Sequence, residues 1–175
     1  MRVIDDDGRE LAPGTVGEVV GASPAAMMTG YHNQPAATAA AEWWDATGKR
    51  FIRTGDLGSF DADGFLTVVG RKKDVIISGG FNVYPVDLEA ALAGHPAVAE
   101  VAVVGVPSPR WGETPIAFVV LRAPADRDAL RAFANDRLGR TQRIADVVIV
   151  AELPRNAIGK VLKRALRDTY PRSTV

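Results

Sequence analysis

The pattern of apolar residues changes near residue 72, and this change restricts the chain to two structural units of different kinds. Before it, short apolar runs rich in β-branched and aromatic residues are separated by turns of Asp, Pro and Gly, as in strands and hairpins. After it, apolar runs of strand length alternate with amphipathic segments of helix length. We therefore predict an α+β fold, with a β-rich subdomain over residues 1–72 and a small α+β domain over residues 73–175.

The first unit is expected to contain four strands and one helix. The strands are predicted over residues 2–5, 17–21, 49–54 and 65–70. Residues 34–44 predict a short helix with Pro35 in its first turn, where the missing amide hydrogen is not needed. We expect Trp43 and Trp44 to lie on the face of this helix that packs against the sheet.

The second unit is expected to combine a β-hairpin with a three-stranded sheet flanked by helices. The hairpin is predicted over residues 74–85, turning at Gly79 and Gly80. The predicted helices cover residues 85–96, 126–139 and 159–170, and the predicted strands cover residues 98–107, 114–121 and 146–150. Asp126 is expected to cap the second helix, and Gly94 and Gly139 to end the first two.

Composition excludes several classes of function. The 175 residues carry 21 Lys and Arg against 21 Asp and Glu, so no net charge draws the chain to nucleic acid or to a membrane surface. There is no cysteine, and the two histidines, His32 and His95, lie far apart in the sequence, so we expect no metal site. No apolar run approaches the roughly 20 residues of a membrane span, and the N-terminus lacks the apolar segment of a secretory signal. We expect a cytoplasmic protein.

Four polar features could bind a ligand, and each also has an ordinary structural explanation. Asp56 in Arg-Thr-Gly-Asp could accept both hydroxyls of a ribose or could simply close a turn. The basic residues 71–73 could bind phosphate or could form a solvated cluster. Gly79 and Gly80 could admit a ligand close to the backbone or could only form a hairpin turn. Lys160 could reach a distant site from a mobile loop or could begin the basic face of a helix.

Together these features resemble a known family in order and in spacing. The quoted segments are GYHNQPAAT (30–38), RTGDLG (53–58), GRKKDVIISGGFNVYPVDLE (70–89), VPSPRWGETPIAFVV (106–120) and LPRNAIGK (153–160). They are similar to the C-terminal region of the adenylate-forming superfamily, which includes acyl-CoA synthetases, luciferases and peptide-synthetase adenylation domains. The likeness is greatest to fatty-acyl-CoA synthetases, and it covers essentially the whole chain.

The resemblance implies a role for each motif residue. Asp56 would hold the ribose hydroxyls of the nucleotide, and Arg71 would contact ribose or phosphate. Lys73 would be the hinge between the two units. Gly79 and Gly80 would line the channel for the pantetheine arm of CoA, and Lys160 would be the catalytic lysine of adenylation. The resemblance implies no metal ligand on this chain.

The implied reaction is adenylation of a carboxylic acid by ATP to acyl-AMP and pyrophosphate, followed by thioester formation with CoA. The full-length enzyme would need ATP, Mg²⁺ and CoA, and the acceptor could be CoA or the phosphopantetheine of an acyl carrier.

Residues 1–52 contain nothing like the family's phosphate loop or acyl pocket. Residues 1–72 would then be the last β-subdomain of a large domain, with a distorted barrel shape, and residues 73–175 the mobile C-terminal domain. We expect an inactive fragment that binds none of these cofactors tightly and whose partner is the missing large N-terminal domain. The alternative is a non-catalytic module that binds an acyl carrier or another protein.

Overall fold

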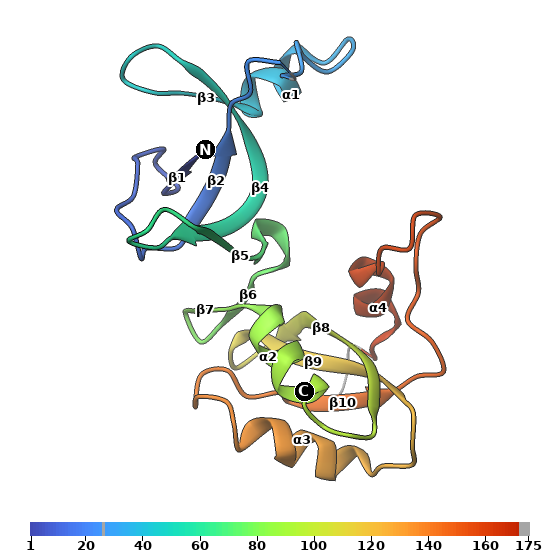
Figure 1. The fold of residues 1–175 in the computed structure, drawn as a ribbon. Helices are drawn as coiled ribbons and strands as arrows, with labels where there is room; N and C mark the ends of the chain where they lie inside the picture. The colour runs from blue at the N-terminus through green and yellow to red at the C-terminus, as the bar shows by residue number, and fades with distance from the viewer. Residues whose placement is uncertain (26, 172–175) are drawn as a thin grey trace. The chain divides into compact units, whose positions relative to one another are not determined.

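The chain folds into two compact units, which meet between Lys73 and Asp74. The computed structural model describes residues 1–25 and 27–171 (Figure 1). The first unit is β-rich and the second combines a sheet with helices, so the α+β class predicted from the sequence is confirmed. Whether the two units move as the predicted domains remains a prediction. Among the described helices, none has the length and apolar character needed to span a bilayer.

The first unit is an antiparallel sheet with one short helix. Its strands are β1 (Arg2–Ile4), β2 (Gly17–Gly21), β3 (Glu42–Trp44), β4 (Arg50–Phe60) and β5 (Leu66–Arg71), and its helix is α1 (Pro35–Ala40). The order is β1-β2-β4-β3, and β5 also pairs with β4. In the part of the chain that is described, the sheet is open and does not close into a barrel. Its core is formed by Ile4, Val20 and Phe51.

Two local expectations for this unit were wrong. Arg53 to Asp56 lie inside β4 and do not form a turn, because this segment pairs with strands on both sides. The tryptophans lie on β3 after α1 has ended, since Trp43 and Trp44 pair in register with residues of β4. Trp43 packs edge-on against Phe51, with ring centroids 5.2 Å apart, and its indole N–H donates to the carbonyl oxygen of Gly8.

The second unit has a mixed five-stranded sheet with helices on both faces. Its strands are β6 (Ile76–Ser78), β7 (Phe81–Val83), β8 (Val98–Ser108), β9 (Gly112–Leu121) and β10 (Asp146–Ile149). The order is β10-β9-β6-β7, with β8 also paired to β9, and only the β9–β10 pair is parallel among the described strands. The predicted hairpin and three-stranded sheet are therefore one sheet, joined where Ser78 pairs with Gly112.

Alternation along β8 and β9 assigns the helices to opposite faces. One face packs against α2 (Pro85–Ala93) and α3 (Arg127–Asn135), through residues such as Val103, Leu88 and Leu130. The other face packs against α4 (Lys163–Thr169), through Phe118 and Leu166. Because side chains alternate across a strand, the two apolar runs of β8 and β9 supply two separate cores.

Helix ends were predicted less well than helix positions. Asp126 caps α3 as predicted, since its carboxylate accepts from the amides of Asp128 and Ala129. The helix nevertheless ends at Asn135, four residues before Gly139. Gly94 ends α2 in a right-handed conformation. The last helix begins only at Lys163, because residues 155–161 form a separate loop.

Candidate functional site

Asp56 and Arg71 face each other on neighbouring strands. They are directly paired in register between β4 and β5, and Oδ1 of Asp56 lies 2.8 Å from Nε of Arg71. The guanidinium also donates to the carbonyl oxygen of Thr54 at 3.1 Å. The Asp56 side chain is 34% exposed, and among the described residues its Oδ2 makes no hydrogen bond. A solvent-facing carboxylate oxygen therefore stands beside a fixed cation, an arrangement that can accept hydroxyl protons.

A bulge in β4 displaces Asp56 from regular pairing with β2. Two residue steps on β2, from Glu18 to Val20, face four steps on β4, from Arg53 to Leu57. Gly55 within the bulge has φ +71°, a conformation that other L-residues rarely adopt. The Thr54 hydroxyl donates to the carbonyl oxygen of Val19 at 2.8 Å and accepts from the Asp56 amide at 3.1 Å. Bulges of this kind redirect a side chain next to a functional site.

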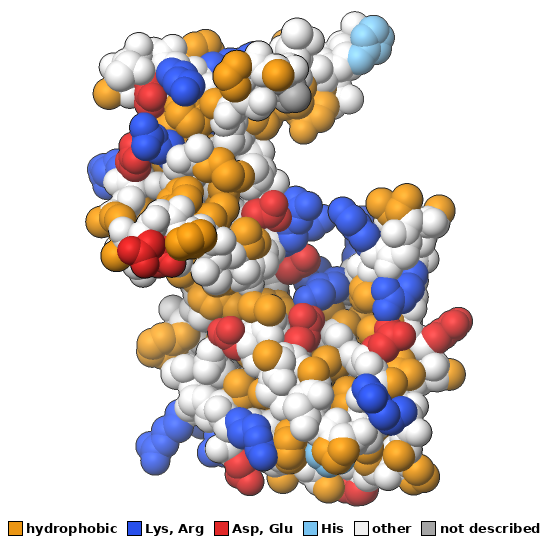
Figure 2. All heavy atoms as spheres, in the orientation of Figure 1, with side chains coloured by type: hydrophobic (Ala, Val, Ile, Leu, Met, Phe, Trp, Pro, Cys, Tyr) orange, Lys and Arg blue, Asp and Glu red, His pale blue; other side chains and the backbone are white. Residues whose placement is uncertain are grey.

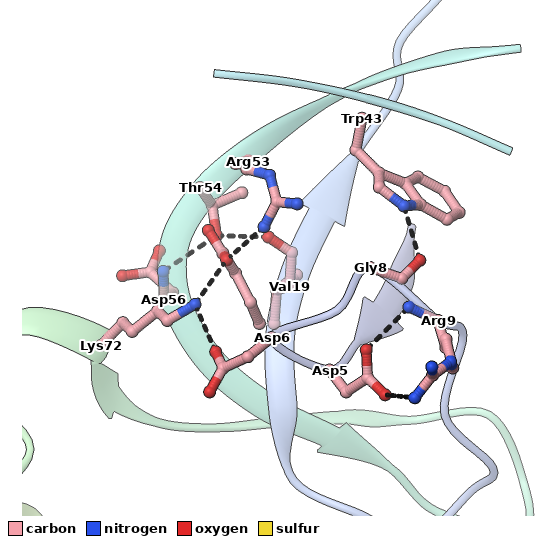
Figure 3. Close-up of polar contacts among 11 residues, drawn as sticks. Asp5, Asp6, Gly8, Arg9, Val19, Trp43, Arg53, Thr54, Asp56 and Lys72 are labelled. Carbon is pink, nitrogen blue, oxygen red and sulfur yellow. Dashed lines mark hydrogen bonds and ion pairs between the residues drawn. The ribbon is translucent and has the colours of Figure 1, made fainter. Parts of the chain in front are cut away.

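Beside this site lies a cluster of charges around the buried Glu18, which we call the Glu18 cluster: Glu18, Arg53, Lys72 and Asp6. Figure 3 labels Arg53, Lys72 and Asp6. Oε2 of Glu18 lies 2.8 Å from Arg53 Nη1 and 3.1 Å from Lys72 Nζ, and Lys72 Nζ lies 2.8 Å from Asp6. The contact with Asp6, followed by that with Glu18, raises the pKa of Lys72, and Lys72 lowers the pKa of Asp6. No local pattern in the sequence predicts this cluster; its one visible signal is the acidic Glu18 directly before the two valines of β2.

Lys73 lies in a single turn of 3-10 helix, Lys72–Asp74, at the boundary between the units. Its side chain is exposed, and it forms no ion pair with any residue that the structure describes. Its neighbour Lys72 is held by the Glu18 cluster. The two adjacent lysines therefore differ in how firmly they are anchored.

Gly79 and Gly80 form the hairpin turn between β6 and β7, with φ values of +58° and +83°. Two positive φ values in succession are typical of the tight type I′ turn. The amide of Gly79 donates to the carbonyl oxygen of Trp111 at 2.8 Å. A Cβ atom at Gly79 would lie 3.1 Å from Cε3 of Trp111, whereas at Gly80 no described atom lies within 4 Å.

A pocket of about 320 Å³ opens beside this turn. Its lining combines apolar and aromatic side chains with hydroxyls and two arginines, and consists of Ser78, Gly79, Phe81, Trp111, Thr114, Arg140, Thr141, Arg143, Ile144 and Ala145. We call it the Trp111 pocket. Gly79 lines this pocket and Gly80 does not, and the channel expected at both residues stays a prediction. The Trp111 ring is 44% exposed and lies under the guanidinium of Arg110, 4.7 Å from the ring centroid.

Lys160 lies on a short loop that its own hydrogen bonds define. Its amide donates to Oδ1 of Asn156 at 2.9 Å, and its carbonyl accepts from the Asn156 amide at 2.9 Å. Arg155 donates to the carbonyl oxygen of Gly159 at 2.7 Å and also pairs with Glu100 on β8. The Lys160 side chain itself is exposed. The loop therefore presents a cation to solvent from a hydrogen-bonded backbone, ahead of the helix that begins at Lys163. Movement of this loop remains a prediction.

The predicted site residues thus fall into two groups, one on each unit. Asp56, Arg71 and Lys73 belong to the first unit, and Gly79, Gly80 and Lys160 belong to the second. The described residues contain no group of three or more His, Asp or Glu side chains placed to bind a metal ion. On the face drawn in Figure 2, acidic and basic side chains are interspersed.

Comparison with known proteins finds a family match in the second unit. Residues 87–160 match the family model of the AMP-binding enzyme C-terminal domain. This match is consistent with the C-terminal region of the adenylate-forming enzymes. The AMP-binding C-terminal domain thus accounts for most of the second unit, from α2 to Lys160.

Relatives and solved structures match almost the whole chain. The 2-succinylbenzoate–CoA ligase of Geobacillus kaustophilus is 46% identical over 95% of this chain and 33% of its own length. A fatty acid–[acyl-carrier-protein] ligase, ScoC, of Streptomyces coeruleorubidus is 43% identical over 97% of this chain and 32% of its own. The ATP-bound structure of MatB from Rhodopseudomonas palustris has a TM-score of 0.89 at 36% identity, over 98% of this chain and 34% of that one. The chain therefore spans about a third of the length of the relatives it matches.

Proposed function

We propose that this chain is the C-terminal part of an acyl-CoA synthetase, which forms an acyl-adenylate from a carboxylic acid and ATP and then a thioester with CoA. The strongest support is that the two groups of site residues occur in a chain whose second unit matches the AMP-binding C-terminal domain. A carboxylate–guanidinium pair on the first unit and an exposed lysine on the second are what this reaction needs at the nucleotide. Proteins named as CoA ligases match nearly the whole chain.

Asp56 and Arg71 would bind the nucleotide portion of ATP. Oδ2 of Asp56 can accept a hydrogen bond from a ribose hydroxyl, and Oδ1 can accept a second while keeping its contact with Arg71. The partly exposed guanidinium can turn a free N–H toward a ribose or phosphate oxygen. The bulge in β4 holds the carboxylate in place before the ligand arrives.

Lys160 would supply positive charge to the adenylation step. The carboxylate oxygen attacks the α-phosphorus of ATP, and the bond from this phosphorus to the bridging oxygen breaks, so that pyrophosphate leaves. Negative charge develops on the oxygens of the α-phosphoryl group and on the leaving oxygen. A lysine ammonium is a compact charge suited to that position. One preorganised donor of this kind contributes about 2.7–4 kcal/mol, or about 10²–10³ in rate. The ordered loop of Asn156 and Arg155 supports such preorganisation.

The Trp111 pocket would take part in the thioester step. Its apolar and aromatic lining residues fit the pantetheine arm of CoA or of an acyl carrier, and the lining residues Arg140 and Arg143 fit phosphate groups. The lack of a side chain at Gly79 keeps the pocket open against the Trp111 ring. The sulfur would attack the acyl carbonyl and release AMP.

Lys73 would act as the hinge about which the second unit rotates between the adenylation step and the thioester step. Lys160 must approach the nucleotide during adenylation and leave so that the thiol can enter. A single exposed residue in a short 3-10 turn can change its backbone angles without breaking a strand or a long helix. The acyl pocket, which would select the carboxylic acid, would lie in the large N-terminal domain.

That large domain would also carry the phosphate loop, and with it most of the positioning of ATP and acid. We therefore expect no adenylation by this chain alone. Mg²⁺ would enter with ATP; because the described residues offer no cluster of metal ligands, we assign it none on this chain.

The test is to mix the chain with a separately produced large domain of an acyl-CoA synthetase, ATP, Mg²⁺, a carboxylic acid and CoA. Acyl-CoA formation that disappears with Lys160→Ala supports the proposal. The alternative, a non-catalytic module, is favoured by the exposed apolar side chains of Phe81 and Trp111 beside the pocket. Tight binding of an acyl carrier protein with no acyl transfer in any mixture would support that alternative.

A further inference from the structure

The Glu18 cluster connects elements that the sheet does not place next to each other. Glu18 lies on β2, Arg53 lies on the adjacent β4, and Lys72 follows β5, which pairs with β4 on its other side. The Glu18 carboxylate therefore reaches past β4 to hold the residue just before the boundary at Lys73. Asp6, from the turn between β1 and β2, completes the contact with Lys72.

Burial makes Glu18 the dominant partner in this cluster. Its side chain is only 7% exposed, whereas that of Asp6 is 89% exposed. A buried carboxylate must be paired, and removing a partner leaves an uncompensated charge in a poorly solvated place. The contact between Lys72 and Asp6 is shorter, but water and salt screen it. The buried Glu18 carboxylate is therefore the more persistent anchor for Lys72.

The same carboxylate fixes the strand that holds Asp56. Arg53 lies at the start of the bulge in β4, and Asp56, three residues later in the same strand, pairs with Arg71. Lys72 directly follows Arg71 on the other strand. One buried group thus secures both strands within three residues of the Asp56–Arg71 pair.

We infer that Glu18 is a positioning residue: it anchors Lys72 and Arg53 so that the flexible joint between the units begins at Lys73 and the Asp56–Arg71 pair stays fixed. Two adjacent lysines then have different tasks, one held and one free to move. This inference rests on the proposed function for its meaning, since a defined hinge matters only if the second unit changes position during the reaction.

Trypsin can report whether Lys72 is held. The protease must draw a lysine side chain into its own pocket, so a lysine paired with two carboxylates is cut only after it leaves them. Mass spectrometry separates fragments cut after Lys72 from those cut after Lys73. The ratio of these two cuts is internal to each molecule, and general unfolding moves it toward the ratio of the fully denatured chain in every variant.

We expect the native 175-residue chain to be cut after Lys73 far more than after Lys72. Glu18→Gln keeps the shape of the side chain and removes its charge, and should raise the Lys72-to-Lys73 ratio about tenfold, as expected for loss of a hydrogen bond to a charged group. Glu42→Gln is the matched control, because Glu42 pairs with Arg50 at 2.8 Å on the same sheet, away from the boundary. An unchanged ratio in Glu18→Gln, or an equal rise in Glu42→Gln, overturns the inference.

If Glu18→Gln does not fold, Lys72→Met keeps the test decisive. Amide hydrogen exchange over residues 70–73 should become several-fold faster in Lys72→Met and stay unchanged in Lys73→Met. Equal exchange in the two variants contradicts the anchor. Neither measurement needs ATP or the large domain. A raised ratio with no acyl transfer in the mixing experiment would therefore support the anchor while counting against the proposed function.

Discussion

Replacement of Gly79 by alanine should damage the second unit more than the same change at Gly80. Both residues have positive φ, where a Cβ atom costs about 1–2 kcal/mol. Only at Gly79 does the new methyl group meet a neighbour, Cε3 of Trp111 at 3.1 Å. The half-exposed ring can move aside, and we take an additional cost of about 0.5–1.5 kcal/mol, that of a side chain pushed off its rotamer. The expected losses in unfolding free energy are about 1.5–3.5 kcal/mol for Gly79→Ala and about 1–2 kcal/mol for Gly80→Ala.

Hydrogen exchange resolved by peptide measures this cost in the second unit alone, through the protection of β8 and β9. The difference between the two variants corresponds to a few degrees in the unfolding midpoint, since 1 kcal/mol shifts a domain of this size by about 4–8 °C. Trp111 fluorescence should change only in Gly79→Ala. Gly48→Ala serves as a control, because Gly48 has φ +80° and no described neighbour but lies in the first unit. Equal or greater damage from Gly80→Ala would refute the argument from the Trp111 contact.

Three further predictions concern the second unit. Glu89→Ala should lower the unfolding free energy of this unit by about 2–3 kcal/mol, because one carboxylate oxygen accepts from a β8 amide at 2.9 Å and pairs with Lys163 at 2.7 Å. Urea denaturation measures this loss, and a loss below about 0.5 kcal/mol, the range of ordinary surface changes, would contradict the prediction. Asn156→Ala should speed amide exchange at Lys160 by tenfold or more while leaving β9 unchanged, and a loop as protected as in the native chain would count against preorganisation. Burial, and then a carboxylate on β10, raises the pKa of Tyr170 above its usual 10.0. The contribution of Tyr170 to stability should therefore be complete below pH 10 and disappear as pH rises through the folded pKa. Tyr170→Phe should weaken this loss of stability at alkaline pH, and the same pH profile in the variant as in the native chain would contradict the prediction.

Features set by neighbouring residues could be predicted from the sequence. The hairpin turn at Gly79 and Gly80 and the cap at Asp126 depend on chemistry within a few residues, and both occur where expected. The start of α2 at Pro85 was also correct, because a proline suits the first turn of a helix. The apolar runs of β8 and β9 predicted strands, and both strands occur where expected. In the structure, their side chains pack into two cores on opposite faces of the sheet.

Features set by distant partners could not be predicted in this way. Asp56 looked like part of a turn because Gly55 suits one, but pairing with β2 and β5 makes the segment a bulged strand. Glu18 contacts residues 35 and 54 positions away, and no local pattern records such a meeting. The residue roles at the site came from likeness to a family, and the contacts of Asp56, Arg71 and Lys160 supply physical reasons for them without testing them.

The central claim is tested most directly by measuring adenylation and thioester formation separately in Lys160→Ala. The chain, or its Lys160→Ala variant, is mixed with a large domain, and adenylation is followed by pyrophosphate release while thioester formation is followed separately from supplied acyl-adenylate and CoA. Arg164→Ala, which removes an exposed cation from α4, is the control. We predict that Lys160→Ala slows adenylation by about 10²–10³ and leaves thioester formation near the native rate. Equal slowing of both steps, or of neither, would contradict the account.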